Sequence, residues 1–473
     1  MKSFQKYTTL FRSCAVFILA AVSFTAYAAD KALLDILLDN GAITKEQHTE
    51  LMKKPSLSSK DFEAVEEKVE KAVDEKVAKK VDKEFPVKVS HGKKGFRFES
   101  RDGNWQTNLQ WRAQLRYTSP TTGDPRSLAN FTSGTSSNTF EARRLRMKIG
   151  GHGFRPWIGY YFEVDLQPTR DSDDSSSNAS SRVIDWRITL DKYKALALRL
   201  GQWKIDYNRE RVDSSGRQQF VERSIANRIF TIDRQVGAQL RGRLFEGTPG
   251  DMRYYAGVFT GEGRGVRNDD EDLMYMARLQ WNFLGRDLKW RQTDVEYTDK
   301  PTGSLSFAAA TNTGRCTRWS SSGCGNLSGF LSPATAANGQ YKVEQATQGF
   351  AFKYRGLSVQ EELHWKTIDD TVNNTTSDLT GGYAQAGYFF HHLIPAIPKN
   401  LEIAARYAFV NEPNSGNIAI DNNRQEFTLG ANWFFAGHNN KITADYSHLT
   451  LDDGVANRDV DDDRFRVQWD VSF

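Results

Sequence analysis

The last eleven residues of the chain, DRFRVQWDVSF, alternate between polar and apolar side chains. Successive side chains on a β-strand point to opposite faces, so one face of this strand is polar and the other carries Phe465, Val467, Trp469, Val471 and Phe473. One wet face and one apolar face are the pattern of a strand in an outer-membrane β-barrel. A soluble β-sandwich is the alternative, but the aromatic chain end and the repetition of the pattern upstream disfavour it.

The same alternation recurs upstream, beginning with the segment WQTNLQWRAQLRY. Each run is close to the ~9–11 residues that a tilted strand needs to cross a membrane. An even number of strands is expected when both barrel ends lie on one side of the membrane. The sequence therefore predicts an all-β fold, a transmembrane antiparallel β-barrel of sixteen strands. The runs lie near 105–117, 140–149, 157–167, 182–190, 195–204, 230–245, 252–260, 273–283, 291–310 (the weakest), 345–355, 357–367, 382–390, 401–410, 424–435, 441–449 and 463–473.

Connections of two kinds separate these runs. Short, glycine-rich segments at 150–153, 247–250 and 437–440 have the composition of tight turns. They alternate with long polar segments at 118–137, 168–181, 205–228, 311–343, 411–422 and 450–462. We expect the short turns on the periplasmic side and the long loops outside the cell.

The N-terminus has the pattern of a secretory signal peptide, which we assign to residues 1–28. Basic side chains come first, an apolar stretch follows at 14–22, and Ala26-Tyr27-Ala28 provides a small-residue cleavage site. No other segment approaches the 18 uninterrupted apolar residues of a spanning helix. If the protein lies in a membrane, it is therefore expected to cross it with strands.

Between the signal and the barrel, expected at 95–473, the sequence predicts two further segments. Residues 29–58 have a short helical pattern and are assigned to the periplasm. Residues 59–86 are a candidate coiled-coil stalk, and a trimer of such stalks would suit a trimeric barrel. A single solvated helix is the alternative, because valine is a weak helix former. The apolar stripe of the stalk is Phe62, Val65, Val69, Ala72, Val73, Val77 and Val81.

Composition does not contradict a barrel. Hydrophobic residues make up 39% and charged residues 26% of the chain, which looks soluble, but a barrel strand exposes half of its side chains to water. The formal net charge of +4 falls to about +1 once the three basic residues of the signal are removed, since the signal contains no Asp or Glu. Any charge selectivity must come from where the charges lie.

The polar face of the predicted strands is predominantly basic. Rings of Arg and Lys in a narrow tube concentrate anions and repel cations, so we expect an anion channel. The alternative is that these side chains pair with carboxylates and stiffen the wall. The basic set is Arg112, Arg116, Arg144, Arg146, Lys148, Arg187, Arg199, Arg241, Arg243, Arg278, Lys353, Arg355, Lys366, Arg406, Arg424, Arg464 and Arg466; the acidic set is Glu163, Asp165, Asp185, Glu362, Glu402, Glu426, Asp445 and Asp470.

The third long loop is a candidate constriction. If it folds into the barrel, Arg209, Arg211 and Arg217, with the hydroxyls of Ser214 and Ser215, would present donors to an oxyanion. An outward, solvated loop is the alternative.

The mature chain contains two cysteines, eight residues apart. Cys14 leaves with the signal, and in an oxidising compartment Cys316 and Cys324 favour a small loop disulfide. Two free thiols are the alternative; a metal site is disfavoured, because two soft ligands have no histidine nearby.

Several short motifs together resemble the phosphate-selective porin O and P family, over roughly residues 95–473. They are Arg143-Arg144-Leu145-Arg146 before Gly150-Gly151, Asp233-Arg234-Gln235-Val236-Gly237-Ala238-Gln239-Leu240, Tyr255-Ala256-Gly257-Val258-Phe259, Ile397-Pro398-Lys399 before Leu401-Glu402, Ala405-Arg406-Tyr407, and Leu429-Gly430-Ala431-Asn432-Trp433 before His438-Asn439.

The resemblance implies a sixteen-stranded trimeric porin that binds phosphate or polyphosphate through wall arginines and a basic side chain on loop three. Carried onto this chain, it implicates Arg143, Arg144, Ser214, Ser215 and Arg217. The family pattern has a lysine near the position of Arg217, and arginine keeps the charge but changes the geometry. The full candidate anion-binding set is Arg143, Arg144, Arg146, Arg112, Ser214, Ser215, Arg217, Arg241 and Arg243.

The sequence thus predicts a bacterial outer-membrane porin, a homotrimer among lipid and lipopolysaccharide that passes phosphate or other small anions. No cofactor, metal or nucleic acid is expected. A structural or adhesive barrel tethered by its stalk is the alternative. An enzyme is disfavoured, because no Ser/His arrangement is recognisable. The acidic loops at 171–174 and 461–463 are interpreted as solvated surface rather than as cation sites.

Overall fold

The computed structural model describes residues 34–35, 38–39, 44–53, 87–119, 138–166, 182–266, 268, 271–320, 323–412, 422–453 and 458–473. The chain divides into two compact units, residues 1–87 and 88–473. In the first unit, helix α3 (Lys45–Met52) lies within the segment predicted to be helical. The predicted signal peptide and the predicted coiled coil lie outside the described residues. No described helix is both long and apolar enough to cross a membrane.

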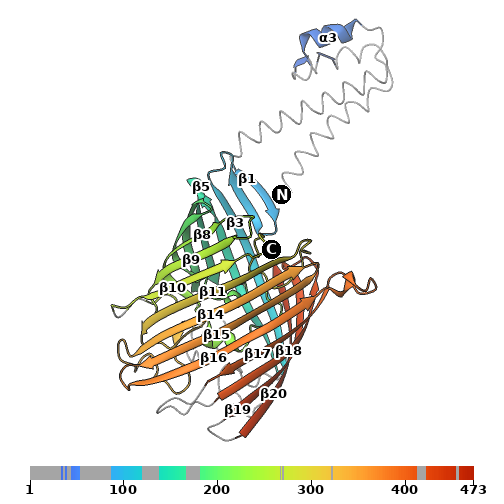
Figure 1. The fold of residues 1–473 in the computed structure, drawn as a ribbon. Helices are drawn as coiled ribbons and strands as arrows, with labels where there is room; N and C mark the ends of the chain where they lie inside the picture. The colour runs from blue at the N-terminus through green and yellow to red at the C-terminus, as the bar shows by residue number, and fades with distance from the viewer. Residues whose placement is uncertain are drawn as a thin grey trace. The chain divides into compact units, whose positions relative to one another are not determined.

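The second unit is a closed antiparallel β-barrel of sixteen strands (Figure 1). The last strand, β20 (Arg458–Ser472), pairs with the first, β3 (Gln106–Ser119), and this pairing closes the sheet on itself. The predicted sixteen-stranded barrel is therefore confirmed. The strands between them are β4 (Thr139–Gly153), β5 (Arg155–Asp165), β6 (Arg182–Tyr193), β7 (Leu196–Lys204), β8 (Arg234–Leu244), β9 (Met252–Phe259), β10 (Met274–Trp281), β11 (Thr302–Gly314), β14 (Tyr341–Tyr354), β15 (Leu357–Asp370), β16 (Thr375–Tyr388), β17 (Leu401–Asn411), β18 (Asn422–Phe434) and β19 (Asn440–Asp453).

A hairpin extends the wall beside β3. It consists of β1 (Val87–Gly92) and β2 (Gly95–Ser100), and β2 pairs with the first residues of β3. The C-terminal Phe473 exchanges backbone hydrogen bonds of 2.9 and 3.2 Å with Trp111. β3 begins before this point, so the hairpin pairs with the part of β3 that β20 does not reach. Most of this hairpin precedes residue 95, where the barrel was expected to begin.

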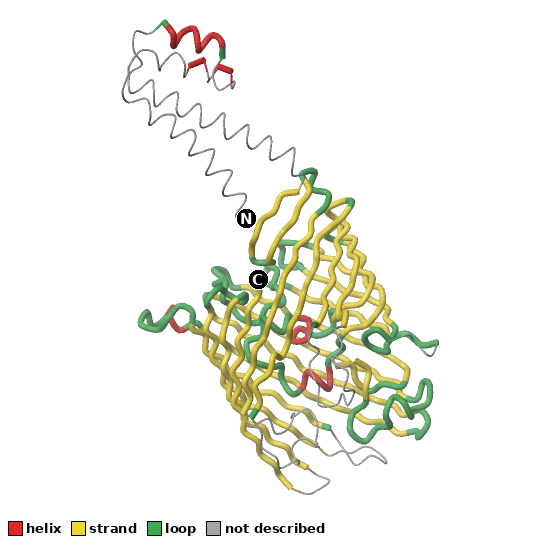
Figure 2. Tube along the Cα trace, turned by 180° about the vertical axis from the view of Figure 1, so that it is seen from behind, coloured by secondary structure: helices red, strands yellow, loops and turns green. Residues whose placement is uncertain are grey.

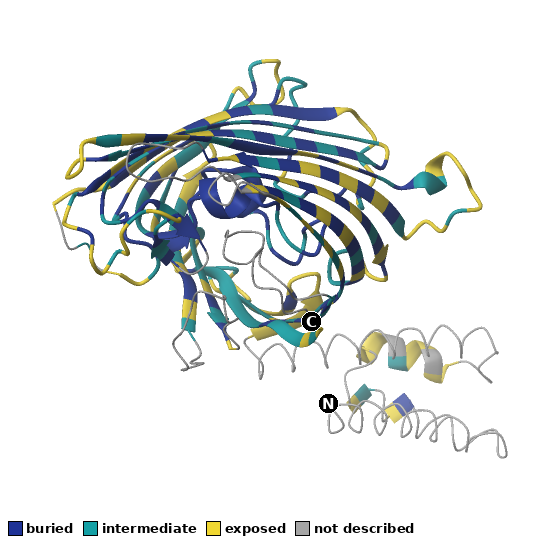
Figure 3. Ribbon diagram, turned by 90° about the horizontal axis from the view of Figure 1, so that it is seen from below, coloured by how far each residue is buried: buried dark blue, intermediate teal, exposed yellow. Residues whose placement is uncertain are grey.

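Buried residues alternate with more exposed ones along most strands of the barrel (Figure 3). On β20, Phe465 and Trp469 are 44% and 43% exposed, whereas Arg466, Gln468 and Asp470 are buried. The predicted register of this strand is correct. Its exposed aromatic residues form part of the apolar outer face that a membrane barrel presents to lipid.

Several predicted boundaries are wrong. The predicted long loop 450–462 is mostly strand, since β19 ends at Asp453 and β20 begins at Arg458. Residues 150–153 continue β4 instead of forming a turn, because their glycines serve close strand packing: a Cβ on Gly151 would lie 1.7 Å from the Gln106 carbonyl oxygen. The predicted run 291–310 is a strand only from Thr302 onward. The Asp294 carboxylate holds the preceding turn, accepting the Thr298 N–H at 3.0 Å and the Gly356 N–H at 2.8 Å.

Most short connections and the C-terminus lie at one end of the barrel, called here the short-turn end, and most long loops lie at the other, the long-loop end. The exceptions are the long connection 282–301 at the short-turn end and the short connection 371–374 at the long-loop end. Arg355 was expected in the lumen but lies exposed in the short turn between β14 and β15. Its φ of 46° shows why: the tight turn ends the alternation there and directs the side chain outward.

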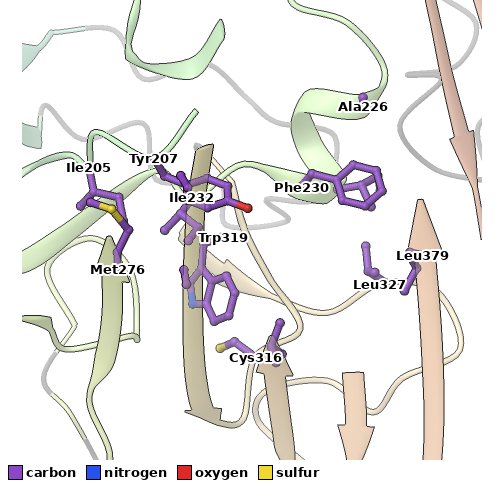
Figure 4. Close-up of a cluster of buried hydrophobic side chains, with 14 of the residues drawn as sticks. Ile205, Tyr207, Ala226, Phe230, Ile232, Met276, Cys316, Trp319, Leu327 and Leu379 are labelled. Atoms are coloured by element: carbon purple, nitrogen blue, oxygen red, sulfur yellow. The ribbon is translucent and has the colours of Figure 1, made fainter. Parts of the chain in front are cut away.

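One side of the barrel interior is filled by apolar side chains. The β7–β8 loop carries α6 (Arg209–Val212) and α7 (Ala226–Phe230), and the β11–β14 loop carries β12 (Arg318–Ser320) and β13 (Gly323–Gly325). Both loops fold inside the wall, where short helices are visible (Figure 2). Phe230 and Trp319 belong to one buried cluster with Met276 of the wall (Figure 4). The alternation predicted that the whole lumen is lined by polar side chains and filled with water. This prediction is wrong for the side that the two loops fill.

Truncating Phe230 should destabilise this cluster. The ring is 1% exposed and stacks on His364 with centroids 5.3 Å apart, so Phe230→Ala should cost about 3–5 kcal/mol. A folded barrel migrates faster than its unfolded chain in detergent gel electrophoresis. The temperature at which heating converts the fast band to the slow band should therefore fall in this variant. Phe140→Ala is the matched control, because Phe140 is 74% exposed on the outer face. Equal transition temperatures for both variants would contradict a packed interior.

Candidate functional site

The β7–β8 loop, loop three, is fixed to the far wall by carboxylates. Glu362 on β15 accepts the backbone N–H of Arg209 and, at 2.9 Å, that of Glu210. Asp445 on β19 accepts the Val221 N–H at 2.9 Å, and Glu426 on β18 accepts the Ile225 N–H at 3.0 Å. Charged acceptors make strong hydrogen bonds to backbone donors. These wall carboxylates thus hold the loop across the lumen.

A β-bulge on β4 turns two consecutive arginines inward. The register between β3 and β4 shifts at Gln114 and Leu115, so Arg144 lies opposite Gln114 and Ala142 lies opposite Leu115. The extra residue in this bulge is Arg143. Both Arg143 and Arg144 reach Glu222 of loop three, with N–O distances of 3.2 and 3.5 Å. The bulge is the reason that neighbouring side chains share the lumen face.

Glu222 lies at the centre of an arginine cluster. Its carboxylate is also 2.8 Å from Arg116 of β3. Burial would raise the pKa of Glu222, but the charges of Arg116, Arg144 and Arg143 hold that pKa well below its usual range. Glu222 is therefore ionised at neutral pH.

Next to this cluster is a small cavity of about 30 Å³, large enough for a water or a small ion. Nine of its lining residues are basic and one is acidic. The basic residues are Arg143, Arg144, Arg146, Arg182, Lys204, Arg211, Arg223, Arg234 and Arg264; the others are Asp165 and Ser215.

Ion pairs neutralise only part of this charge. Arg146 contacts Glu163 and Asp165, both at 3.1 Å. Arg211 pairs with Asp233, and Arg234 pairs with Asp185. In contrast, Arg182, Lys204, Arg223 and Arg264 form no ion pair with any carboxylate that the structure describes.

The remaining positive charge affects loop residues at the cavity. Arg264 lies in the β9–β10 loop. Its burial, with the charges of Arg182 and Arg234, lowers its pKa to about 10. Arg264 remains protonated at neutral pH, and an anion bound beside it would stabilise its positive charge.

A second cavity, of about 670 Å³, continues from the first. Arg146, Lys204 and Arg234 line both. The larger cavity also reaches Gln106 and Pro156, at the short-turn ends of β3 and β5. The larger cavity, at the short-turn end, is called here the vestibule, and the small basic cavity beside loop three is called the constriction. Other basic residues that line this vestibule are Lys94, Lys148, Arg187, Arg199 and Arg217.

Residues 117–473 match the model of the family described as phosphate-selective porin O and P. The chain belongs to this family. It is an outer-membrane porin, and its barrel forms a channel. A search of curated proteins found no match.

Solved structures similar to this porin are also outer-membrane proteins. The outer-membrane channel DcaP of Acinetobacter baumannii is 12% identical, with a TM-score of 0.51, and the match covers 80% of this chain and 99% of that one. A loop-deletion mutant of OmpT from Vibrio cholerae is 12% identical, with a TM-score of 0.50, over 78% and 99%. An anion-selective porin from Comamonas acidovorans is 12% identical over 78% and 99%, with a TM-score of 0.46. At these identities the likeness concerns the fold alone.

The structure brings several predicted site residues of this porin together. Arg143, Arg144, Arg146 and Ser215 line the constriction. Ser214 and Arg217 line the vestibule next to it. Arg217 forms no ion pair with a carboxylate in the described part of the chain.

Three predicted residues lie elsewhere. Arg112 of β3 connects loop three to the barrel wall: it donates a hydrogen bond of 3.1 Å to Ser215 of the loop and pairs with Asp470 of β20 at 3.2 Å. Arg241 pairs with Asp206 at 3.3 Å. Arg243 pairs with Asp251 and with Glu246 in the short turn after β8. None of the three lines the constriction or the vestibule.

Other constriction residues carried no sequence signal. Arg182 is the first residue of β6, and Arg264 lies in a long loop, where no alternation assigns a face. Lys204 and Arg234 are the strand residues that flank loop three. Alternation from Arg199 on β7 and from Arg241 on β8 would place them on the outer face. They line both cavities nevertheless, at the strand ends next to loop three.

The two cysteines are joined in a disulfide, with their Cα atoms 5.7 Å apart. The bond links the segments that carry β12 and β13, and the Trp319 carbonyl between them accepts the Asp233 N–H at 3.2 Å. Glu262 lies close to both sulfur atoms, but sulfurs bonded to each other are not free to bind a metal. The disulfide loop therefore supports the end of loop three.

Proposed function

We propose that this porin is a passive channel that selects anions and holds an oxyanion, preferably phosphate, weakly and transiently at its constriction. The observation that carries this proposal is the lining of the constriction, with nine basic residues and one acidic residue. Cationic linings attract anions and exclude cations, and conduction requires that a bound ion can leave again. Arginine favours phosphate because its planar fork offers two parallel donors to neighbouring oxygens.

The test is a planar-bilayer measurement on the purified full-length protein. Across a KCl gradient the reversal potential should have the sign of chloride selectivity, and added phosphate should block the chloride current with saturation. Sulfate serves as a comparison of similar shape. Cation selectivity, or an anion current that phosphate does not block, would contradict the proposal.

A structural or adhesive barrel remains the second candidate, and one observation favours it. Wall arginines pair with wall carboxylates, as Arg466 does with Asp445 at 2.7 Å, and as Arg406 does with Glu426. Such pairs stiffen a wall without creating a pore. Absence of any conductance in the bilayer would favour this candidate.

We further infer a homotrimer surrounded by outer-membrane lipid and lipopolysaccharide, with the short-turn end in the periplasm. The family resemblance and the short turns support this arrangement. We assign residues 29–58 to a periplasmic helical segment and residues 59–86 to a coiled-coil stalk, on the pattern of their apolar positions.

Deleting residues 30–85 should leave conductance and selectivity unchanged, because the barrel unit begins at residue 88 and contains both cavities. Bilayer recordings of the deletion variant check this, with cross-linking of the outer-membrane fraction to compare its oligomeric state. A lost current in correctly inserted protein would mean that the segment belongs to the pore.

A further inference from the structure

The arginine cluster at the constriction already holds an oxyanion, and that oxyanion is a side chain of the protein. Oε1 of Glu222 lies 2.8 Å from Arg116, 3.2 Å from Arg143 and 3.5 Å from Arg144. Arg143 and Arg144 also line the small cavity. A carboxylate and a phosphate both present oxygens that guanidinium groups bind. An incoming anion must therefore share these arginines with Glu222.

We propose that Glu222 sets the affinity of the constriction for anions, as a tethered counter-ion that competes with the passing ion for Arg143 and Arg144. This inference rests on the proposed anion channel and specifies how its site is kept weak. A tethered group competes at an effective concentration in the millimolar range or above. Without it, a buried group of three guanidinium ions would retain a multivalent anion, and retention opposes conduction.

The surroundings of Glu222 indicate that its side chain is not needed to hold the loop. The backbone on both sides is fixed independently, since Val221 and Ile225 donate their N–H groups to Asp445 and Glu426. The Glu222 carbonyl oxygen accepts a hydrogen bond of 3.0 Å from Arg406. Neutralising the carboxylate therefore leaves these three anchors in place.

The arginines also keep other partners when Glu222 is neutral. Arg116 donates to Gln468 at 2.7 and 3.0 Å, and Arg144 donates to Gln114 at 2.9 Å. These amide acceptors orient the guanidinium groups but carry no charge. A Glu222→Gln variant should therefore keep the geometry of the cluster and increase its net positive charge.

The experiment compares phosphate block of the chloride current in full-length wild type and Glu222→Gln. The half-blocking phosphate concentration should fall by about tenfold or more in the variant, as expected when a charged, hydrogen-bonded competitor is removed. Glu222→Asp retains the charge but withdraws it by one methylene, so its half-blocking concentration should fall less, by about threefold. Glu99→Gln is the matched control, because Glu99 pairs with Arg97 on the β1–β2 hairpin and lines neither cavity.

The outcomes separate this inference from the proposed function. If wild type is anion-selective and blocked by phosphate, but Glu222→Gln needs the same or more phosphate, the competition by Glu222 is refuted and the anion channel stands. If wild type is neither anion-selective nor blocked, both fail. If Glu222→Gln does not insert, Glu222→Asp decides, and an unchanged half-blocking concentration in that variant overturns the inference.

Discussion

Replacing both Arg182 and Arg264 with glutamate should abolish most of the proposed anion selectivity of the channel. Both side chains line the constriction, and neither pairs with a carboxylate that the structure describes. The Nε atom of Arg182 is buried without a hydrogen-bond partner. The double change removes two positive charges from the lining of the small cavity and adds two negative ones. The reversal potential across a KCl gradient should therefore move toward zero.

A matched charge change elsewhere provides the control for this variant. Arg355 lies exposed in the short turn between β14 and β15, Arg286 lies half-buried in the connection between β10 and β11, and neither lines the vestibule or the constriction. Arg286→Glu combined with Arg355→Glu alters the net charge equally and should keep the reversal potential close to that of wild type. If the Arg182 and Arg264 variant also kept it, the permeation path would not pass through the small cavity.

The barrel could be predicted from the sequence because its signal is local and repeated. Lipid outside and polar groups inside act on every strand with a period of two, so each strand reports its own register. The final strand illustrates this: Phe465 and Trp469 lie outside, and Arg466 and Gln468 inside, as the alternation predicts.

The constriction could be predicted only in part, because a bulge and strand ends interrupt the alternation. Alternation assigns Arg144 to the lumen and its neighbour Arg143 to lipid, yet the bulge on β4 places both inside. Arg143 entered the prediction only through the family resemblance. Arg234 also lines the constriction against the alternation, and it is the first residue of β8, directly after loop three.

The filled side of the lumen could not be predicted, because it depends on contacts between residues distant in sequence. Phe230 packs near Trp319 and Met276, which come from another loop and from the wall. Apolar residues such as Met274 and Val343 point inward and therefore break the alternation of polar and apolar positions in the sequence. Only the folded loops supply the apolar surface that buries them.

Removing the carboxylate of Glu362 should release loop three and raise the single-channel conductance severalfold. Glu362 accepts the backbone N–H groups of Arg209 and Glu210, and it accepts the Tyr383 hydroxyl at 3.0 Å. Hydrogen bonds to a charged group contribute roughly 1.5–3 kcal/mol each. In Glu362→Ala, two buried N–H groups lose their acceptor, so the first half of the loop should leave the wall and widen the constriction.

Planar-bilayer recordings in KCl check this prediction, and the preceding residue provides a close control. Glu361 lies on the same strand, but the alternation of β15 directs its side chain to the outer face, so Glu361→Ala should leave the conductance unchanged. Phosphate block should weaken in Glu362→Ala alone, because Arg217 and Ser215 move away with the loop. Wild-type conductance in Glu362→Ala would mean that Asp445 and Glu426 suffice to hold the loop, and the constriction would then depend on residues 221–225 rather than on α6.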